Sequence, residues 1–484
     1  MILALDLGTG SVKALLMSDT GIIQGEASAP YVVRSPRSGW AESSPEEWWK
    51  ATAEAIREAV GPRGSQVSAL GLSGQMHGVV LSDASGDPLR SAILWADTRS
   101  REQLASYSDL DESLRRKLAN PPAVGMAGPS LLWLRDHESE RYRIARWALQ
   151  PKDWLRLRLT GEAAAEPSDA SATLLYDLES DGWSEDVIES LGLRTDFLAP
   201  LVGSADAAGT LTPEAAEHLG MPAGLPVAAG AADTAAAILG TGLWEPGTPQ
   251  LTVGTGGQIV ALREDSAPDP DGRTHLYRTA WEPAGRFYSM AAIQNAGLAL
   301  EWARNVLGAT WDDVYREAFD VSPGADGLLF LPYLSGERTP RFDPDARGAW
   351  TGLGLNHSRG HLLRSALEGV AFALREGLEA LEAAGIAAPE LRLAGGGSAD
   401  ESWRQLLADV LGRPLGILPG SIASSASARG AAILAGLASG IYRTSEDVLA
   451  LAPEIQDAVH PGPDRGEYED SYSRFRELYP RLYG

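Results

Sequence analysis

Residues 1–17 read MILALDLGTGSVKALLM: an apolar run reaches Asp6, a glycine-rich turn spans residues 8–10, and a second apolar run begins at Val12. This pattern is typical of a β-hairpin whose tight turn exposes backbone N–H groups beside a carboxylate. Backbone N–H groups gathered in a turn form a concave site for anions. The first stretch therefore predicts a phosphate-binding turn.

The same design recurs at residues 251–262, which read LTVGTGGQIVAL. Gly254 follows Gly8 by 246 positions, close to half of the 484-residue chain. A repeat with that period indicates two similarly built lobes, with a nucleotide phosphate chain in the cleft between their turns. Neither turn is a dinucleotide fingerprint, because Lys13 and Ile259 stand where that motif needs glycine, and the chain has no Gly-Lys-Ser/Thr P-loop. Each turn alone is an ordinary hairpin signal, so the hypothesis depends on their pairing.

Helical periodicity alternates with short apolar strands outside the two turns, for example at residues 45–60 and 129–138. This alternation predicts an α/β fold in both lobes. The alanine-rich tract at residues 423–438 predicts a helix that packs closely against its neighbours, because its side chains are small.

Proline and glycine cluster at residues 224–230 and again at residues 244–247, which marks a junction between periodic segments. We therefore expect an N-terminal lobe over residues 1–244, with the first phosphate turn, and a C-terminal lobe over residues 245–484, with the second.

The chain carries a formal charge of −24. This charge repels polyphosphate backbones and anionic lipid surfaces, so we expect neither nucleic acid nor a membrane as partner. Any bound phosphate must be held by local N–H groups, a few cations or a metal. The absence of cysteine excludes disulfides and thiol nucleophiles. The N-terminus lacks a secretory pattern and no apolar run reaches about 18 residues, so we expect a soluble cytoplasmic protein, with a homodimer left open.

Two aspartates are candidates for the chemistry of phosphoryl transfer, which needs a carboxylate to accept a proton and a divalent metal. Asp233 follows the small residues of 228–232 and precedes a helical stretch, so substrate could approach it closely and the helix end would favour its ionised form as a base. A plain helix N-cap is the alternative. Asp6, beside the first turn, could bind Mg²⁺ through water, or could merely stabilise the turn.

Two further stretches could bind a ligand. Residues 71–78, GLSGQMHG, end a strand with Gln75, Met76 and His77, whose polar groups could bind the hydroxyls and carbonyl of a sugar. A structural histidine is the alternative. Residues 393–398, LAGGGS, read as strand, glycine loop and helix start; the glycines would let a ring or ribose approach the backbone, although a simple connection looks the same.

At these positions the chain resembles the FGGY family of carbohydrate kinases, nearly end to end. Besides Asp233 and residues 254–255, the matching stretches are 6–9 DLGT, 75–78 QMHG, 93–99 ILWADTR, 151–161 PKDWLRLRLTG, 331–340 LPYLSGERTP, 367–372 LEGVAF and 395–409. Several of these motifs are long and they follow the family order.

The resemblance implies two actin-like lobes of the ribonuclease H type that close over ATP, Mg²⁺ and a sugar. It implies Asp233 as the catalytic base, Asp6 as a catalytic and Mg²⁺-binding residue, and Gln75, Met76 and His77 as the sugar contacts. It implies that the ATP site is formed by Gly8, Thr9, Lys13, Gly254, Thr255, Gly395, Gly396 and Gly397, with the last three along the adenosine.

The resemblance is strongest to family members that phosphorylate D-xylulose to D-xylulose 5-phosphate, a preference that residues 75–78 support. Another sugar or polyol, such as ribulose, gluconate, glycerol or erythritol, is the main alternative. A non-metabolic actin-like ATPase is the alternative from another class, since fold alone does not set function.

Overall fold

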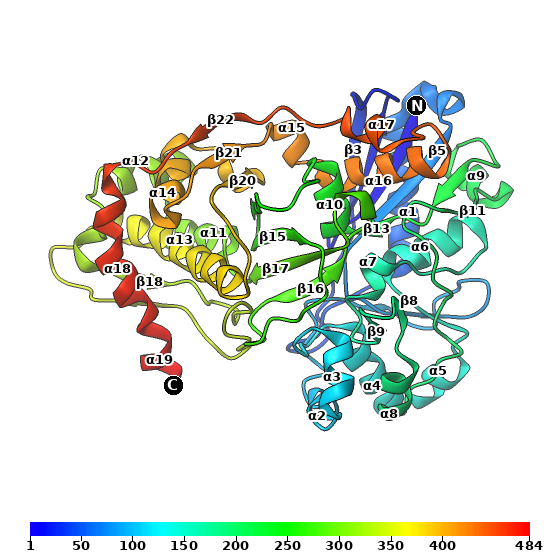
Figure 1. Ribbon diagram of the computed structural model, residues 1–484, viewed down its shortest axis with the longest axis horizontal. Coiled ribbons are helices and arrows are strands. Elements are labelled where there is room, and N and C mark those ends of the chain that lie inside the picture. The colour runs from blue at the N-terminus through cyan, green and yellow to red at the C-terminus, as the bar shows by residue number, and fades with distance from the viewer.

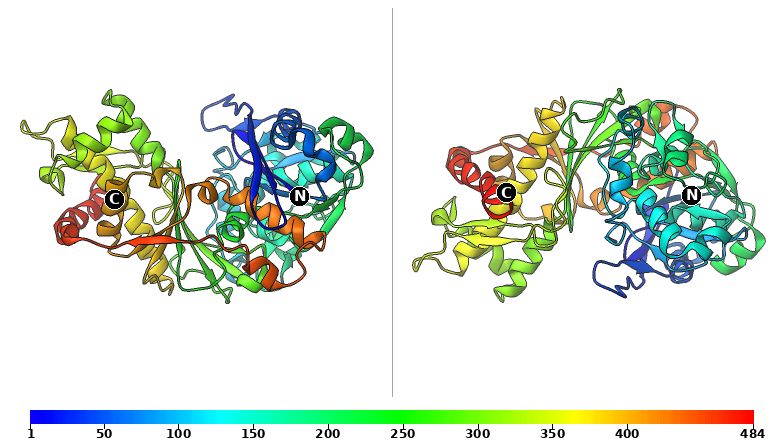
Figure 2. Two further views of the ribbon diagram at one scale, coloured as in Figure 1. Left: turned by 90° about the horizontal axis from the view of Figure 1, so that it is seen from above. Right: turned by 90° about the horizontal axis from the view of Figure 1, so that it is seen from below.

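The structure is a computed structural model that describes residues 1–484, apart from the side chains of Ala284, Ser398 and Asp457. Two seven-stranded sheets organise the described chain into two lobes, which Figures 1 and 2 show side by side. The first sheet contains β1 (Ile2–Leu7), β2 (Ser11–Met17), β3 (Ile23–Pro30), β5 (Ala69–Gly74), β11 (Ala207–Thr210), β12 (Pro226–Ala228) and β13 (Ala231–Ala232). The second contains β14 (Gln250–Val253), β15 (Gly257–Arg263), β16 (His275–Arg278), β17 (Phe287–Ile293), β20 (Leu391–Ala394), β21 (Leu415–Ile417) and β22 (Gln456–Val459).

The two lobes repeat one arrangement of strands, as the paired glycine turns predict. In the first sheet β1 pairs antiparallel with β2 and parallel with β5. In the second sheet β14 pairs antiparallel with β15 and parallel with β20. Both lobes therefore combine antiparallel hairpins with parallel crossovers, which confirms the α/β fold class with two lobes.

The helices cover the sheets where their apolar faces require burial. Helix α1 (Pro45–Val60) starts with proline and two glutamates and carries Arg57 in its last turn, both of which favour a helix. It buries Trp48 and Ile56. It packs on β2 and β3, and the 25-residue helix α13 (Arg359–Ala383) packs on β15 and β17 of the second lobe. The helix expected at residues 129–138 is α4 (Ala127–His137). None of the described helices combines the length and apolar character needed to cross a membrane.

Helix α16 (Ala426–Ala438) is the alanine-rich tract, and its packing confirms the expected close approach. In the chain it lies between β21 and β22 of the second sheet, but it packs on β1, β5 and α10 (Asp233–Gly240) of the first lobe, where Figure 1 draws it in orange. A Cβ added to Gly71 would lie 1.9 Å from the carbonyl oxygen of Ala431, and one added to Gly430 would lie 1.9 Å from that of Ala236. Only glycine allows the backbones to meet so closely. Helix α16 therefore lies after residue 245 in the sequence but packs in the N-terminal lobe.

The lobes have apolar clusters of their own, and another cluster joins the two lobes. This joining cluster contains Ile2 and Leu15 from the first sheet, Val260 and Tyr288 from the second, and the inner face of α16, with Ala431 as one member. Burial of such a shared surface is the main attraction between packed elements. The base of the cleft is therefore a packed junction between the lobes.

Candidate active site

Three parallel strand ends bring the two candidate aspartates to the same edge of the first sheet. Strand β5 pairs in parallel with β1 on one side, where Asp6 is the partner of Ser73, and with β13 on the other, where Ala231 is the partner of Ser73. Asp233 follows β13 directly as the first residue of α10. Because the carboxyl ends of parallel strands meet at one edge, residues 227 positions apart in the chain become neighbours.

The Asp233 carboxylate is held by the start of its own helix. The backbone N–H of Thr234 donates to Asp233 Oδ1 over 2.6 Å, and Thr234 Oγ1 lies 3.2 Å from the same oxygen. Although the side chain keeps some exposure, burial of its carboxyl and the nearby negative charge of Asp6 raise the Asp233 pKa to about 7. A carboxylate with that pKa can take up a proton near neutral pH.

Asp6 is half-buried and its carboxylate is hydrogen-bonded. Ser73 Oγ donates to Asp6 Oδ1 over 2.8 Å. Burial raises the pKa of Asp6, while this hydrogen bond and the charge of Lys13, its cross-strand partner in β2, oppose the rise. Among the described residues, no three His, Asp or Glu side chains gather as a metal site.

The first glycine turn is fastened by side chains from elsewhere in the lobe. The carbonyl of Gly8 accepts hydrogen bonds from Tyr31 and from Gln75 Nε2, the latter over 3.1 Å. Trp95 Nε1 donates to Thr9 Oγ1 over 2.9 Å. The amide nitrogen of Gln75 is thus directed at the turn, and the assignment of Gln75 to sugar binding stays a prediction.

Lys13 does not point freely toward the turn. Its Nζ donates to the carbonyl of Ser424 over 2.6 Å and lies 3.1 Å from Glu26 Oε1. The assignment of Lys13 to the nucleotide site stays a prediction. The structure adds that this cation already has two oxygen partners.

The second glycine turn and the 395–397 loop lie together, as the first lobe's geometry would suggest. Strands β14 and β20 are parallel neighbours, with Thr252 opposite Ala394, so the turn after β14 and the loop after β20 share one edge. Gly395 has φ +96°, and a Cβ added there would lie 2.3 Å from the Val253 carbonyl oxygen. A side chain at Gly395 is therefore excluded by both conformation and space. The carbonyl of Gly254 in turn accepts from Gly297 N over 2.9 Å, at the start of α11 (Gly297–Val306).

His77 is held in an unusual conformation at the cleft side of the first lobe. It adopts φ +72°, which is rare for a residue with a side chain and is found where structure imposes it. Its Nδ1 lies 2.9 Å from the carbonyl of Ala172, which can only accept, so Nδ1 carries the proton. Burial and the nearby charge of Arg338 lower the His77 pKa to about 3. The ring is therefore neutral, and Nε2 is an acceptor.

Met76 faces a different environment from its neighbour. Its side chain is buried in the apolar cluster that joins the lobes, together with Ala172 and Tyr277. The ring of Tyr277, from β16, lies 6.1 Å from that of His77. Residues of the second lobe therefore complete the surroundings of residues 76–77.

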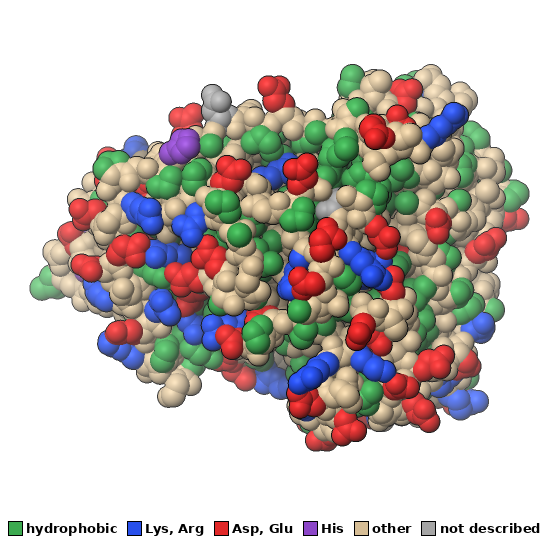
Figure 3. All heavy atoms as spheres, viewed as in Figure 1, with side chains coloured by type: hydrophobic (Ala, Val, Ile, Leu, Met, Phe, Trp, Pro, Cys, Tyr) green, Lys and Arg blue, Asp and Glu red, His purple; other side chains and the backbone are tan. Residues whose placement is uncertain are grey.

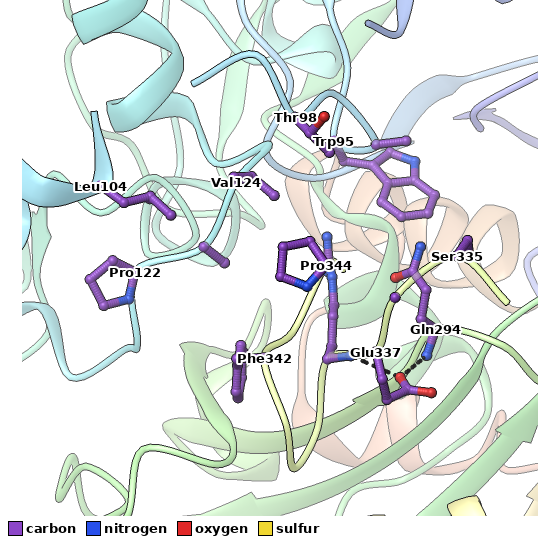
Figure 4. Close-up of a pocket in the computed structure, with 14 residues that line it drawn as sticks. Trp95, Thr98, Leu104, Pro122, Val124, Gln294, Ser335, Glu337, Phe342 and Pro344 are labelled. Carbon is purple, nitrogen blue, oxygen red and sulfur yellow. Dashed lines mark hydrogen bonds between the residues drawn. The ribbon is translucent and has the colours of Figure 1, made fainter. Parts of the chain in front are cut away.

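Two cavities share lining residues and open between the lobes. One, of about 350 Å³, is lined by Trp95 of the first lobe and by the second glycine turn, residues 254–257. The other, of about 110 Å³, lies between residues 95–98 and 122–124 on one side and residues 335–344 on the other (Figure 4). Trp95, Gln294 and Arg338 line both cavities. Sequence reasoning assigned no role to Gln294 or Arg338, although Arg338 stands inside the motif at residues 331–340.

A buried charge network supports the segment that carries Asp233. In the sequence, only the motif at residues 151–161 points to it. Lys152 Nζ, in α6 (Pro151–Thr160), lies 2.6 Å from Asp153, 3.3 Å from Glu166 and 3.4 Å from Asp169. Ser168 Oγ donates to Glu166 and accepts from Ala232 N over 3.0 Å. The network therefore reaches the residue immediately before Asp233.

The chain matches one protein family over most of its length. Residues 1–240 match the N-terminal domain of the FGGY family of carbohydrate kinases, and residues 250–439 match the C-terminal domain. The protein belongs to the FGGY family of carbohydrate kinases, which confirms the resemblance drawn from its motifs.

The relatives are full-length. The chain is 35% identical over 485 residues to the xylulose kinase of Escherichia coli (strain K12), covering 100% of this chain and 99% of that one. It is 32% identical to the xylulose kinase of Bacillus subtilis (strain 168), covering 100% and 96%. Among solved structures, the xyloylose kinase of Brucella ovis superposes with a TM-score of 0.89 at 36% identity, covering 100% and 99%.

Proposed function

We propose that the protein transfers the γ-phosphoryl group of ATP to D-xylulose, giving D-xylulose 5-phosphate, with Asp233 as the general base. The observation that carries the proposal is the position of Asp233: its carboxylate, with a pKa of about 7, stands at the strand edge beside Asp6 and the first glycine turn. The full-length similarity to proteins named xylulose kinase supports the choice of sugar.

The reaction would proceed by in-line transfer. The oxygen of the sugar's 5-hydroxyl forms a bond to the γ-phosphorus, the bond from that phosphorus to the β,γ-bridging oxygen breaks, and ADP leaves with the electron pair. Asp233 takes the hydroxyl proton. The glycine turns of the two lobes would bind phosphate oxygens through backbone N–H groups, which suits a chain whose overall charge is −24.

Mg²⁺ fits the donor set at Asp6. One carboxylate oxygen accepts from Ser73, and Mg²⁺ is commonly held by one or two carboxylates together with waters and substrate phosphates. Asp6 would hold the ion through water, in keeping with the absence of a three-residue cluster among the described side chains. The ion would neutralise charge on the phosphates. The adenosine would lie along Gly395, Gly396 and Gly397.

A substrate panel tests the proposal directly. ADP release is measured in a coupled assay with ketoses, aldonates and polyols, each at several concentrations. We expect D-xylulose to give the highest kcat/KM, and phosphorus NMR to locate the product phosphate at O5. A clear preference for an aldonate or a polyol would replace the sugar assignment, and sugar-independent ATP hydrolysis would favour the ATPase alternative.

The pH dependence of turnover follows from the state of Asp233. Because the base must be ionised, kcat/KM is expected to fall as the pH drops through its pKa, about 7. The hydroxyl of Thr234 donates to the carboxylate and so favours the ionised form. Thr234→Val is expected to raise the Asp233 pKa and to move the acid limb to higher pH. Thr234→Ser, which keeps the hydroxyl, is the matched control, and superimposable profiles for Val and Ser variants would argue against Asp233 as the base.

His77→Ala is expected to raise the KM for D-xylulose roughly tenfold, the usual cost of losing one hydrogen bond. The reason is that neutral His77 offers Nε2 as an acceptor for a sugar hydroxyl. ATP hydrolysis without sugar should change little. His218→Ala, which removes a histidine stacked on Trp49 with ring centroids 4.5 Å apart, is the control. An equal loss of kinase and hydrolysis activities would mark His77 as structural.

A further inference from the structure

Arg338 occupies the place where the two lobes face each other. Its side chain lines both cavities of the cleft, including the one formed by the second glycine turn, residues 254–257. Its guanidinium carbon lies 5.4 Å from the centre of the Trp95 ring, across the cleft. Trp95 in turn donates to Thr9 of the first turn over 2.9 Å. The arginine therefore stands between the glycine turns of opposite lobes.

The loop that carries Arg338 is fastened on both sides of it. Before it, Asn295 Nδ2 donates to the carbonyl of Gly336 over 2.6 Å. After it, Thr339 N donates to the carbonyl of Ala292 over 2.9 Å, and Ala292 N donates to Thr339 Oγ1 over 3.1 Å. Both attachments are to β17 or the residues that follow it. The guanidinium is thus presented from a pre-organised backbone, which is what a binding group needs.

Among the described residues, no carboxylate forms an ion pair with Arg338; burial lowers the pKa of its guanidinium, and the nearby Tyr277 and Glu337 oppose that shift. The adjacent Glu337 directs Oε1 at the backbone N–H groups of Gln294 and Arg338, and burial raises its pKa to about 8 (Figure 4). His77 and His275 also face this region, and burial lowers the pKa of both, so both are neutral. An arginine keeps its charge even when burial lowers its pKa.

Lys13 and Arg338 are cations beside the two glycine turns, and they differ in their partners. Lys13, the cation next to the first turn, is already engaged by the Ser424 carbonyl and by Glu26. Arg338, next to the second turn, forms an ion pair with none of the described carboxylates. Arg338 is half-buried and lines both cavities. A partly desolvated charge that has no carboxylate bound to it favours an anionic ligand.

We propose that Arg338 binds the oxygens of the phosphoryl group in transfer, on its path from the second glycine turn to the sugar beside His77. This rests on the proposed kinase function. Arg338 would form and break no bond to the phosphorus: it would donate N–H groups to the non-bridging oxygens, whose charge it offsets in the transition state. Planar guanidinium groups suit such oxygens because they donate two parallel hydrogen bonds.

The test distinguishes binding of the γ-phosphoryl group by Arg338 from binding of the sugar. Calorimetry measures the binding of ADP and of the nonhydrolysable analogue β,γ-imido-ATP, both with Mg²⁺ and without sugar, to wild type, Arg338→Met, Arg338→Lys and Arg101→Met. Arg101 is the control, since it lies near the cleft in an exposed pair with Asp345, 3.0 Å away. In Arg338→Met we expect the analogue to lose about 10- to 100-fold in affinity relative to ADP, the scale of a charged hydrogen bond. The relative affinity of Arg338→Lys for the analogue should lie between those of wild type and Arg338→Met. That of Arg101→Met should match wild type.

Turnover supplies the second measurement. With the sugar that wild type uses best, Arg338→Met is expected to lose about 10²- to 10³-fold in kcat, as when one transition-state donor is removed. Retained ADP binding shows that the variant is folded. An unchanged ratio of analogue to ADP affinity, or a loss confined to the KM of the sugar, overturns the proposal; the latter outcome would assign Arg338 to the sugar. Because the binding arm needs no sugar, rejection of D-xylulose as substrate leaves this test intact.

Discussion

Asp233→Asn is expected to lower kcat for D-xylulose phosphorylation by roughly 10²- to 10⁴-fold, the usual contribution of general base catalysis. The amide is the same size as the carboxylate, and its oxygen can still accept from Thr234 N, so the start of α10 should persist. What disappears is the proton acceptor. A stopped or continuous assay of ADP release under saturating ATP and sugar measures the loss.

Two controls separate this role from a purely structural role at the start of α10, whose N-cap is Ala232. Binding of ATP analogue and sugar to Asp233→Asn should remain close to wild type, which calorimetry can establish. Asp313→Asn changes another aspartate in the first turn of a helix, α12 (Trp311–Phe319), in an exposed capping box. It is expected to leave kcat unchanged. Turnover of Asp233→Asn within about twofold of wild type would remove Asp233 from the mechanism.

Lys152→Met is expected to destabilise the protein by about 3 to 5 kcal/mol, the cost of breaking a buried ion pair from one side. Burial alone would lower the pKa of Lys152, but Asp153, Glu166 and Asp169 together raise it, so the ammonium is firmly charged. Methionine has a similar length and no charge. Of the three carboxyl groups, Asp153 would keep an ion pair, with Arg156 at 3.0 Å. The free energy of unfolding from denaturant titration should therefore fall.

An exposed lysine provides the matched comparison. Lys117 lies 2.6 Å from Asp186, and both side chains are open to solvent. Lys117→Met should therefore cost less than about 1 kcal/mol, as surface pairs do. Because Ser168 links the Lys152 network to Ala232 N, Lys152→Met should also lower kcat in the fraction that remains folded. Equal stability of the Lys152 and Lys117 variants would contradict the structural role of the network.

The candidate site divides sharply into what local sequence indicates and what it does not. The two glycine turns are visible because a hairpin is formed by residues that are neighbours in the chain. Asp233 is visible because helix starts have local signals. Its pKa of about 7, in contrast, depends on burial and on Asp6, 227 positions earlier. A local sequence pattern does not show that two residues so far apart in the chain lie close together in space.

The side chains of residues 75–77 also lie in surroundings that local sequence does not indicate. Gln75 and Met76 stand beside His77 in the sequence, yet Gln75 bonds to the first turn and Met76 packs in the junction between the lobes. Neighbouring residues after a strand leave it in different directions, so a shared motif does not mean a shared contact. The sequence shows Arg338 only as part of a motif. That none of the described carboxylates forms an ion pair with it is visible only in the folded chain.

The amino-acid sequence by itself determined the α/β class, the duplicated hairpin, the two-lobe plan and the family, since these depend on periodicity, turn chemistry and the order of motifs. The tertiary structure decided which residues meet: parallel register placed Asp6 and Asp233 at one edge, and α16 crossed from the second half of the chain to the first sheet. The physical reason is that strand register and burial are set by contacts between distant segments. These contacts stabilise the protein only when the whole chain is packed, so no single stretch of sequence specifies them.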